Sequence, residues 1–145
     1  LALQLFDSWV GCLGPNDYEK YILPYSRRVF EGLKDTGVPI INFSTGTSTM
    51  LDLVQKAGGD VLSFDWRIEM DTARALLGKD QPVQGNLDPV TLFGPLPLIR
   101  ERVHDILKRS GGKGHIFNLG HGILQHTPVE HVKAVVDMVH EYKHE

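Results

Sequence analysis

Residues 115–122 read HIFNLGHG, and this stretch decides the fold class. An apolar run over 115–117 is followed at once by a polar turn in which His121 stands between Gly120 and Gly122. Two glycines in three positions disfavour a helix, so the imidazole belongs to a turn at the carboxyl end of a buried strand. In α/β folds that edge of the sheet holds the ligands. His121 is therefore the first candidate for a functional residue, and the alternative is a turn histidine that hydrogen-bonds a backbone carbonyl.

The glycines on either side of His121 have a physical role of their own. Without a Cβ atom, a glycine adopts unusual φ values and lets another group approach the backbone closely. We therefore expect close packing or ligand contact at this turn.

Composition bounds the class of protein. The 145 residues suit one domain, which we take as residues 1–145. A net charge of −3 gives no basic footprint for nucleic acid, and no apolar run has the length of a membrane span. The single cysteine, Cys12, permits no internal disulfide and no thiolate zinc site, and it suggests a reduced, cytoplasmic setting. Residues 1–6 already read as a strand and lack an initiating Met, so we expect a fragment of a longer protein.

Strand and helix patterns alternate five times along the chain. Strands are predicted at residues 3–9, 38–43, 61–66, 82–85 and 114–118, and helices at 17–36, 49–57, 71–77, 98–110 and 128–142. Pro24 should kink or split the first helix, and Gly37 should end it. Thr127 is the expected N-cap of the last helix, with Pro128 at its first position.

One face of the first helix is expected to be buried. Its members share a helical spacing: Tyr18, Tyr21, Ile22, Tyr25, Val29 and Leu33.

Strands separated by helices must pair in parallel, and continuously apolar strands indicate that both faces of the sheet are covered. Two architectures fit: an open doubly wound sheet, or a (βα)8 barrel without its first three strands. No G-x-G-x-x-G follows any strand, whereas polar residues follow nearly every strand, as at the catalytic rim of a barrel. The predicted fold class is therefore α/β, the C-terminal portion of a (βα)8 barrel.

Four strand-end motifs occur in a fixed order. They are QLFDS at 4–8, FDW at 64–66, QGNLDP at 84–89 and NLGHG at 118–122. In this order and at these intervals they resemble the uroporphyrinogen decarboxylase family, across the whole chain. The match corresponds to strands four to eight of that family's barrel.

The resemblance implies a function and two site residues. The family forms homodimers, uses no cofactor or metal, and removes carbon dioxide from four acetate side chains of uroporphyrinogen III to give coproporphyrinogen III. Its substrate-contacting serine and histidine correspond here to Ser8 and His121. Its arginine-rich motif, catalytic aspartate and substrate-contacting tyrosine fall upstream of Leu1, so no catalytic residue is assigned in this chain.

The chemistry of the implied reaction agrees with charged and catalytic residues that lie upstream of Leu1. A substrate with eight carboxylates needs cations in its binding site. Arginines suit this role because a guanidinium binds a carboxylate through two hydrogen bonds. Arg67 is the one candidate for such a cation at a strand end. A pyrrole protonated on carbon accepts the electron pair as carbon dioxide leaves, and a buried carboxylate would stabilise that cation. Ser8 and His121 would then hydrogen-bond substrate carboxylates, with proton transfer by His121 a secondary possibility.

Several polar residues have structural interpretations instead. Ser8 could cap a turn, and Asp7 could either orient the site or bind backbone amides. Residues 44–49 lack the lysine of a phosphate-binding loop and should form a helix N-cap turn. We expect Asn86 to buttress the rim and Asp65 to lie at it. Asp88 and Pro89 should start a helix, and Trp66 should pack in the core.

Two other functions stay open. Zinc-dependent cobamide methyltransferases share the barrel fold, but the chain lacks the thiolate ligands of their metal site. His140 and His144 lie one helical turn apart, which allows only incidental metal affinity. The second alternative is an inactive fragment that only binds tetrapyrroles, because five strands cannot close an eight-stranded barrel and leave unpaired edges.

Overall fold

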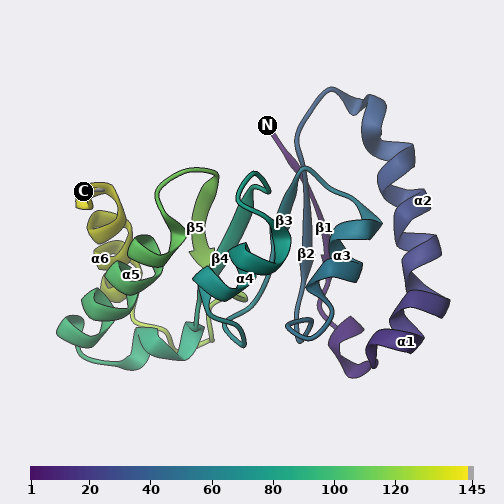
Figure 1. Ribbon diagram of the computed structural model, residues 1–145. Coiled ribbons are helices and arrows are strands. Elements are labelled where there is room, and N and C mark those ends of the chain that lie inside the picture. The colour runs from purple at the N-terminus through teal and green to yellow at the C-terminus, as the bar shows by residue number, and fades with distance from the viewer. Residues whose placement is uncertain (144–145) are drawn as a thin grey trace.

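A computed structural model describes residues 1–143 and contains one five-stranded parallel sheet (Figure 1). Its strands follow one another in space in chain order, from β1 to β5. Their bounds are β1 Leu3–Asp7, β2 Ile40–Ser44, β3 Val61–Ser63, β4 Val83–Leu87 and β5 His115–Leu119. A doubly wound sheet reverses its strand order at a switch point, and this sheet does not. The strand order is that of a partial (βα) barrel.

Helices connect the strands, and each main helix packs against the next one along the chain, from α2 to α6. The α-helices are α1 Pro15–Asp17, α2 Leu23–Leu33, α3 Leu51–Ala57, α4 Met70–Leu77, α5 Leu96–Ser110 and α6 Val129–Glu141. Short helical turns cover Val10–Cys12, Tyr18–Ile22, Lys34–Thr36 and Pro89–Phe93.

The helices all cover one face of the sheet. Two apolar clusters join helix residues to alternate strand residues, among them Leu62 and Val83 in one cluster and Phe117 and Leu119 in the other. The strand residues between these positions face the opposite side. On that side the amide Nε2 of Gln84 in β4 lies 3.3 Å from Oε1 of Gln4 in β1, although two strands separate β1 from β4. Strands so placed would lie roughly 14 Å apart in a flat sheet, so the sheet is curved and this inner face is concave.

The three central strands are more deeply buried than the two edge strands. Every residue of β2, β3 and β4 is buried, as the apolar patterns predicted. The edge strands β1 and β5 instead contain no buried residue, and inner-face residues such as Phe6 and Ile116 are 67% and 46% exposed. The expectation of two covered faces is therefore wrong for the edge strands, because each lacks a neighbour on one side.

Several strands begin or end at residues other than those predicted. The first strand ends at Asp7 and not at residue 9, because the Asp7 carboxylate accepts the backbone N–H of Val10 at 3.1 Å and turns the chain. The third strand ends at Ser63, and the fourth extends through Leu87. The five predicted βα units themselves are confirmed.

The first helix is interrupted, as Pro24 predicted. A π-helical turn over Tyr18–Ile22 precedes α2, and Pro24, which has no backbone N–H to donate, lies in the first turn of α2. Gly37, with φ 72°, follows the last turn. The predicted apolar face is only partly right, since Leu23 and Phe30 are the buried residues of α2 while Tyr21, Tyr25 and Val29 are exposed. The wider π turn rotates the helix relative to a continuous 3.6-residue repeat.

Two predicted caps are wrong. Helix α6 begins at Val129 with Pro128 as its N-cap, and the buried Oγ1 of Thr127 has no hydrogen-bond partner within the described residues. Helix α3 has Met50 as its N-cap and no side-chain cap. The hydroxyls of the preceding turn bond elsewhere, because Ser44 and Thr47 pair with each other at 2.9 Å.

Candidate functional site

Ser8 and His121 line the same cavity on the concave face. The cavity has a volume of about 370 Å³ and lies toward the carboxyl ends of the strands. Its lining residues are Gln4, Phe6, Ser8, Phe43, Ser63, Gln84, Asn118, Leu119, His121 and Gly122. The fold thus brings the first and last strand-end motifs of the chain into one pocket.

The turn that carries His121 is fixed by Gly120. Its backbone N–H donates to the carbonyl of Leu87 at 2.8 Å. A Cβ atom at Gly120 would lie 2.8 Å from the backbone N of Trp66 and 2.9 Å from Cα of Asp65. Close backbone approach therefore requires glycine at position 120, as expected for this turn, while a Cβ at Gly122 would meet open space.

The imidazole of His121 lies over an aromatic floor. Its ring centroid is 6.3 Å from that of Phe43, and Phe43 meets Phe6 edge-on at 5.3 Å. His121 is exposed, and its ring makes no hydrogen bond to any other described residue. The alternative of a turn histidine bound to a backbone carbonyl is therefore wrong, and both ring nitrogens can meet a ligand.

Ser8 lies across the cavity, held through its backbone. Its carbonyl accepts a hydrogen bond from Oγ1 of Thr45 at 2.7 Å. Its own hydroxyl makes no hydrogen bond within residues 1–143, so Ser8 caps no turn. Asp7 does the capping instead, and of the two roles considered for Asp7 the structure supports binding a backbone amide.

Asp65 is a buried structural carboxylate and not a rim residue. It is 2% exposed and accepts the backbone N–H groups of Gly46 at 2.6 Å and Arg67 at 3.0 Å. The guanidinium of Arg67 also pairs with it. The expected position at the rim is wrong because the carboxylate turns inward to tie the β2 and β3 loops together.

Arg67 does not line the cavity of Ser8 and His121. Its guanidinium pairs with Asp65 and lies 4.6 Å over the ring of Trp66, which is half-buried and not a core residue. The one predicted strand-end cation therefore has a structural role.

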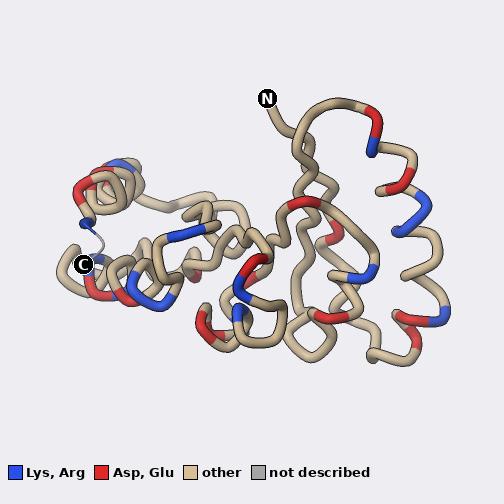
Figure 2. Tube along the Cα trace, turned by 45° about the horizontal axis from the view of Figure 1, so that its top comes forward, with Lys and Arg blue, Asp and Glu red and all other residues tan. Residues whose placement is uncertain are grey.

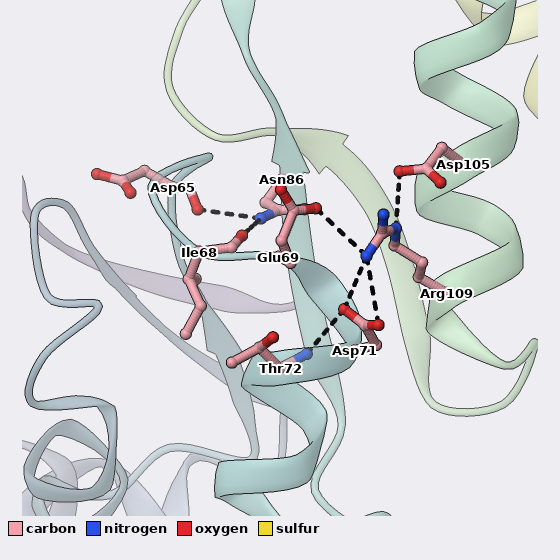
Figure 3. A network of polar contacts seen from close by, with 8 residues as sticks. All are labelled: Asp65, Ile68, Glu69, Asp71, Thr72, Asn86, Asp105 and Arg109. Atoms are coloured by element: carbon pink, nitrogen blue, oxygen red, sulfur yellow. Dashed lines mark hydrogen bonds and ion pairs between the residues drawn. The ribbon is translucent and has the colours of Figure 1, made fainter.

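Asn86 buttresses the rim, as predicted. Figure 3 shows its amide Nδ2 between the carbonyls of Asp65 at 3.1 Å and Ile68 at 2.7 Å. Asp88 likewise begins a helical turn, since its carboxylate accepts the N–H of Val90 at 2.9 Å. Both residues hold loops in place and do not face the cavity.

A cluster of charges links α4 to α5 outside the cavity (Figure 3). Arg109 reaches Glu69 at 3.6 Å, Asp71 at 3.2 Å and Asp105 at 2.8 Å. Partial desolvation raises the pKa of Asp71. Hydrogen bonds from Arg109 and from the Thr72 N–H outweigh it and hold that pKa below its usual value. The cluster is exposed and ties two helices together.

His121 is the only ionisable side chain among the residues that line the cavity. None of its lining residues is Lys, Arg, Asp or Glu. Figure 2 shows the charged residues along the helices and connecting loops, and Asp7 is the one such residue within the five strands. The cavity can therefore donate hydrogen bonds and contact an aromatic ring, but it offers no lysine or arginine to a negatively charged ligand.

The cavity also contains residues that were not singled out from the sequence, among them Gln4, Phe6, Phe43, Ser63 and Gln84. Gln4, Phe6 and Ser8 alternate along β1, and alternate residues of a strand share one face. This alternation could have identified Gln4 and Phe6 from the sequence, because Ser8 was already assigned to the cavity side of the strand.

Metal ligands are not gathered in the described part of the chain. Residues 1–143 contain no group of three or more His, Cys, Asp or Glu side chains that could hold a metal ion. Cys12 is exposed in the turn after β1, and His144 lies outside the described residues.

None of the helices within residues 1–143 combines the length and the apolar character needed to span a lipid bilayer.

Fold and cavity together define a partial (βα) barrel with a cavity toward the carboxyl ends of its strands. The family model for uroporphyrinogen decarboxylase (URO-D) matches residues 1–142. The chain belongs to the uroporphyrinogen decarboxylase family.

Curated relatives carry the same family name. The chain is 56% identical over 141 residues to uroporphyrinogen decarboxylase of Carboxydothermus hydrogenoformans, and 54% identical over 143 residues to that of Solibacter usitatus. The protein of Thermus thermophilus is 53% identical over 140 residues. These matches cover 96–98% of this chain but 40–41% of the relatives, so the chain spans about two fifths of their length.

A solved methyltransferase from Methanosarcina mazei has the same fold. It superposes with a TM-score of 0.82 over 97% of this chain and 42% of its own length, at 19% sequence identity. At this identity the likeness supports the partial barrel and no shared activity.

Proposed function

We propose that this chain forms part of the substrate site of a uroporphyrinogen decarboxylase, in which Ser8 and His121 bind carboxylates of the substrate. The observation that carries the proposal is that these two residues, from opposite ends of the chain, line one cavity of about 370 Å³. Membership of the family supports the substrate class.

The unpaired groups of the cavity suit that role. The Ser8 hydroxyl and an N–H of the His121 ring donate to carboxylate oxygens, and hydrogen bonds to charged groups are among the stronger ones in proteins. Phe6 and Phe43 offer ring faces to a pyrrole. Two contacts at the rim and a ring against the floor orient one acetate group for reaction.

The reaction breaks the bond between the acetate methylene and its carboxylate. A proton first adds to a carbon of the pyrrole, and the electron pair of the breaking bond flows into that cationic ring as carbon dioxide leaves. The methylene then takes a proton to become a methyl group, and the ring loses its extra proton. His121 is close enough to the cavity to take part in proton transfer as a secondary role.

The charges that this chemistry needs are not in the described cavity. Eight substrate carboxylates require cations, and the cationic pyrrole requires an opposing carboxylate. The family resemblance assigns these groups to positions upstream of Leu1. We therefore propose that the complete site combines this neutral face with a charged face formed by that part of the family's barrel.

The same resemblance supports a decarboxylase that uses no cofactor and forms homodimers, and the single cysteine supports a cytoplasmic setting. Analytical ultracentrifugation of the complete enzyme checks the assembly, with a dimer expected.

A chimaera tests the proposed function. This chain replaces the matching 141-residue segment of the Carboxydothermus hydrogenoformans relative, and coproporphyrinogen is followed by fluorescence after oxidation. The chimaera should convert uroporphyrinogen, and Ser8→Ala and His121→Ala should each lower kcat/KM about 10- to 100-fold, since each removes a hydrogen bond to a charged group. An inactive chimaera, or two variants with unchanged kcat/KM, contradicts the proposal.

A further inference from the structure

Ser8 lies in a loop that is held from the side of β2. Within residues 1–143, β1 pairs with β2 alone, and the register places Asp7, the last residue of β1, opposite Ser44, the last residue of β2. Ser8 follows Asp7 in the chain, and Thr45 follows Ser44. The loop after β2 is therefore the neighbour that can fix the backbone of Ser8.

Thr45 joins that loop to two consecutive residues after β1. Its backbone N–H donates to the carbonyl of Asp7 at 3.3 Å, and its hydroxyl Oγ1 donates to the carbonyl of Ser8 at 2.7 Å. Thr45 is 9% exposed, so water competes little for its hydroxyl. Because Thr45 does not line the cavity, its hydroxyl can affect a ligand there only through the residue that it holds.

The loop that carries Thr45 is itself fixed on two sides. The N–H of Gly46 donates to the buried carboxylate of Asp65 at 2.6 Å. On another side the loop packs against Gly11, where a Cβ atom would lie 2.3 Å from the carbonyl oxygen of Thr45 and 2.6 Å from Cα of Gly46. Close-packed contacts of this kind resist displacement. Thr45 is thus a firm point from which the Ser8 backbone can be held.

A second buried threonine of the same loop makes a different hydrogen bond. Oγ1 of Thr47 lies 2.9 Å from Oγ of Ser44, and Thr47 is 1% exposed. That bond stays within residues 44–47 and does not reach Ser8. Thr47 is therefore a matched comparison, because both hydroxyls are buried and hydrogen-bonded but only that of Thr45 reaches a residue in the cavity.

We infer that Thr45 is a positioning residue whose hydroxyl holds the backbone of Ser8, so that the Ser8 hydroxyl faces the bound carboxylate. The inference rests on the proposed function. The Ser8 hydroxyl makes no hydrogen bond within residues 1–143, so its place depends on the backbone that carries it. Small displacements of a group that orients the substrate lower the rate strongly. Thr45 thereby links substrate binding at β1 to the buried Asp65 after β3.

Thr45→Val in the chimaera tests the inference, because valine removes the hydroxyl and nearly keeps the shape of the side chain. It should lower kcat/KM for uroporphyrinogen about tenfold. Thr45→Ser keeps the hydroxyl and should stay within about threefold of the parent. Thr47→Val is the matched control and should also stay within about threefold, even where its melting temperature falls as far as that of Thr45→Val.

A double-mutant cycle shows whether Thr45 acts through Ser8. In Ser8→Ala the group that Thr45 positions is already gone, so adding Thr45→Val should change kcat/KM by less than about twofold. A general loss of structure would instead lower kcat/KM by the same factor with and without Ser8.

Three results overturn the inference. They are equal kcat/KM values for Thr45→Val and Thr47→Val, a loss of activity that Thr45→Ser shares with Thr45→Val, and the full tenfold loss from Thr45→Val in the Ser8→Ala background. If Thr45→Val does not fold, Thr45→Ala and Thr47→Ala replace the valine variants, and the same comparisons decide.

The two proposals fail in different ways. If Ser8→Ala and His121→Ala lower kcat/KM but Thr45→Val does not, the inference about Thr45 is wrong and the proposed function stands. If the chimaera is inactive, or if Ser8→Ala and His121→Ala leave kcat/KM unchanged, both are contradicted.

Discussion

At the scale of single residues, the site depends on a backbone contact that only glycine allows. Gly120 lies against Asp65 and Trp66, and this contact sets the position of the next residue, His121. A glycine was expected to permit close approach at this turn. The approaching group is a neighbouring loop, which only the fold could reveal.

Gly120→Ala should destabilise the chain by about 1–3 kcal/mol, because backbone atoms on both loops must move to admit the Cβ. Denaturant unfolding measures this loss. Gly122→Ala is the control, with no atom near its added Cβ and no positive φ, and should change stability by no more than about 0.5 kcal/mol. Equal effects of the two substitutions would contradict this account of the turn.

Asp65 supplies the second prediction at this scale. Asp65→Ala leaves the N–H of Gly46 and the N–H of Arg67 without their acceptor, and should cost about 2–4 kcal/mol in unfolding free energy. Asp52→Ala, at an exposed ion pair with Lys56, should cost less than about 0.5 kcal/mol. If Asp65→Ala is as mild as Asp52→Ala, the buried carboxylate does not hold the loops.

At the scale of helices and strands, Tyr18 links the first helical segment to the end of β1. Burial, with the nearby charge of Asp7, raises its pKa to about 12, although a hydrogen bond with Ser26 opposes the shift. Above pH 10 the unfolded chain loses the hydroxyl proton while the folded chain keeps it. The stability that this group contributes is therefore lost as the pH rises from 10 to 12.

The free energy of unfolding should fall by about 2 kcal/mol over that range on account of Tyr18. Chemical denaturation at each pH measures it. Tyr18→Phe should remove this part of the slope, while Tyr25→Phe, at a 65% exposed position, should leave it unchanged. If the free energy of unfolding falls equally with pH in Tyr18→Phe and in the parent, the buried hydroxyl does not titrate as described.

The sequence predicted the elements well where local chemistry decides them. Gly37 ended the first helix, Pro24 marked its interruption, and Asp88 began a helical turn. Predictions that needed tertiary contacts failed: Asp65 was placed at the rim, Thr127 was expected to cap a helix, and the π turn displaced the apolar face of α2. The inner part of the cavity was missed because it joins residues from four strands, and the face that they share emerges only from the register.

At the scale of the whole molecule, the sheet has two free edges and an uncovered concave face. Phe6 on β1 and Ile116 on β5 are exposed there. The curated relatives are about two and a half times as long, since the chain spans about 40% of their length. Because the cavity contains no Lys or Arg and the sheet edges are open, we expect turnover to need groups beyond this chain.

The 145-residue chain by itself should therefore show no decarboxylase activity. Uroporphyrinogen is added to the purified chain, and coproporphyrinogen is measured by fluorescence after oxidation, with the active chimaera as the positive control. Turnover by the chain alone would mean that the charges required for catalysis lie within residues 1–145.

We propose that Ser8 and His121 bind one ligand in one cavity, and an NMR titration of the isotope-labelled chain tests this proposal. On addition of uroporphyrinogen under reducing conditions, the Ser8 backbone amide and the His121 ring signals should shift together and give the same dissociation constant. His104, whose ring lies 5.3 Å from that of Tyr142 and away from the cavity, should not move. Shifts at only one of the two residues, or two different dissociation constants, would contradict the shared site.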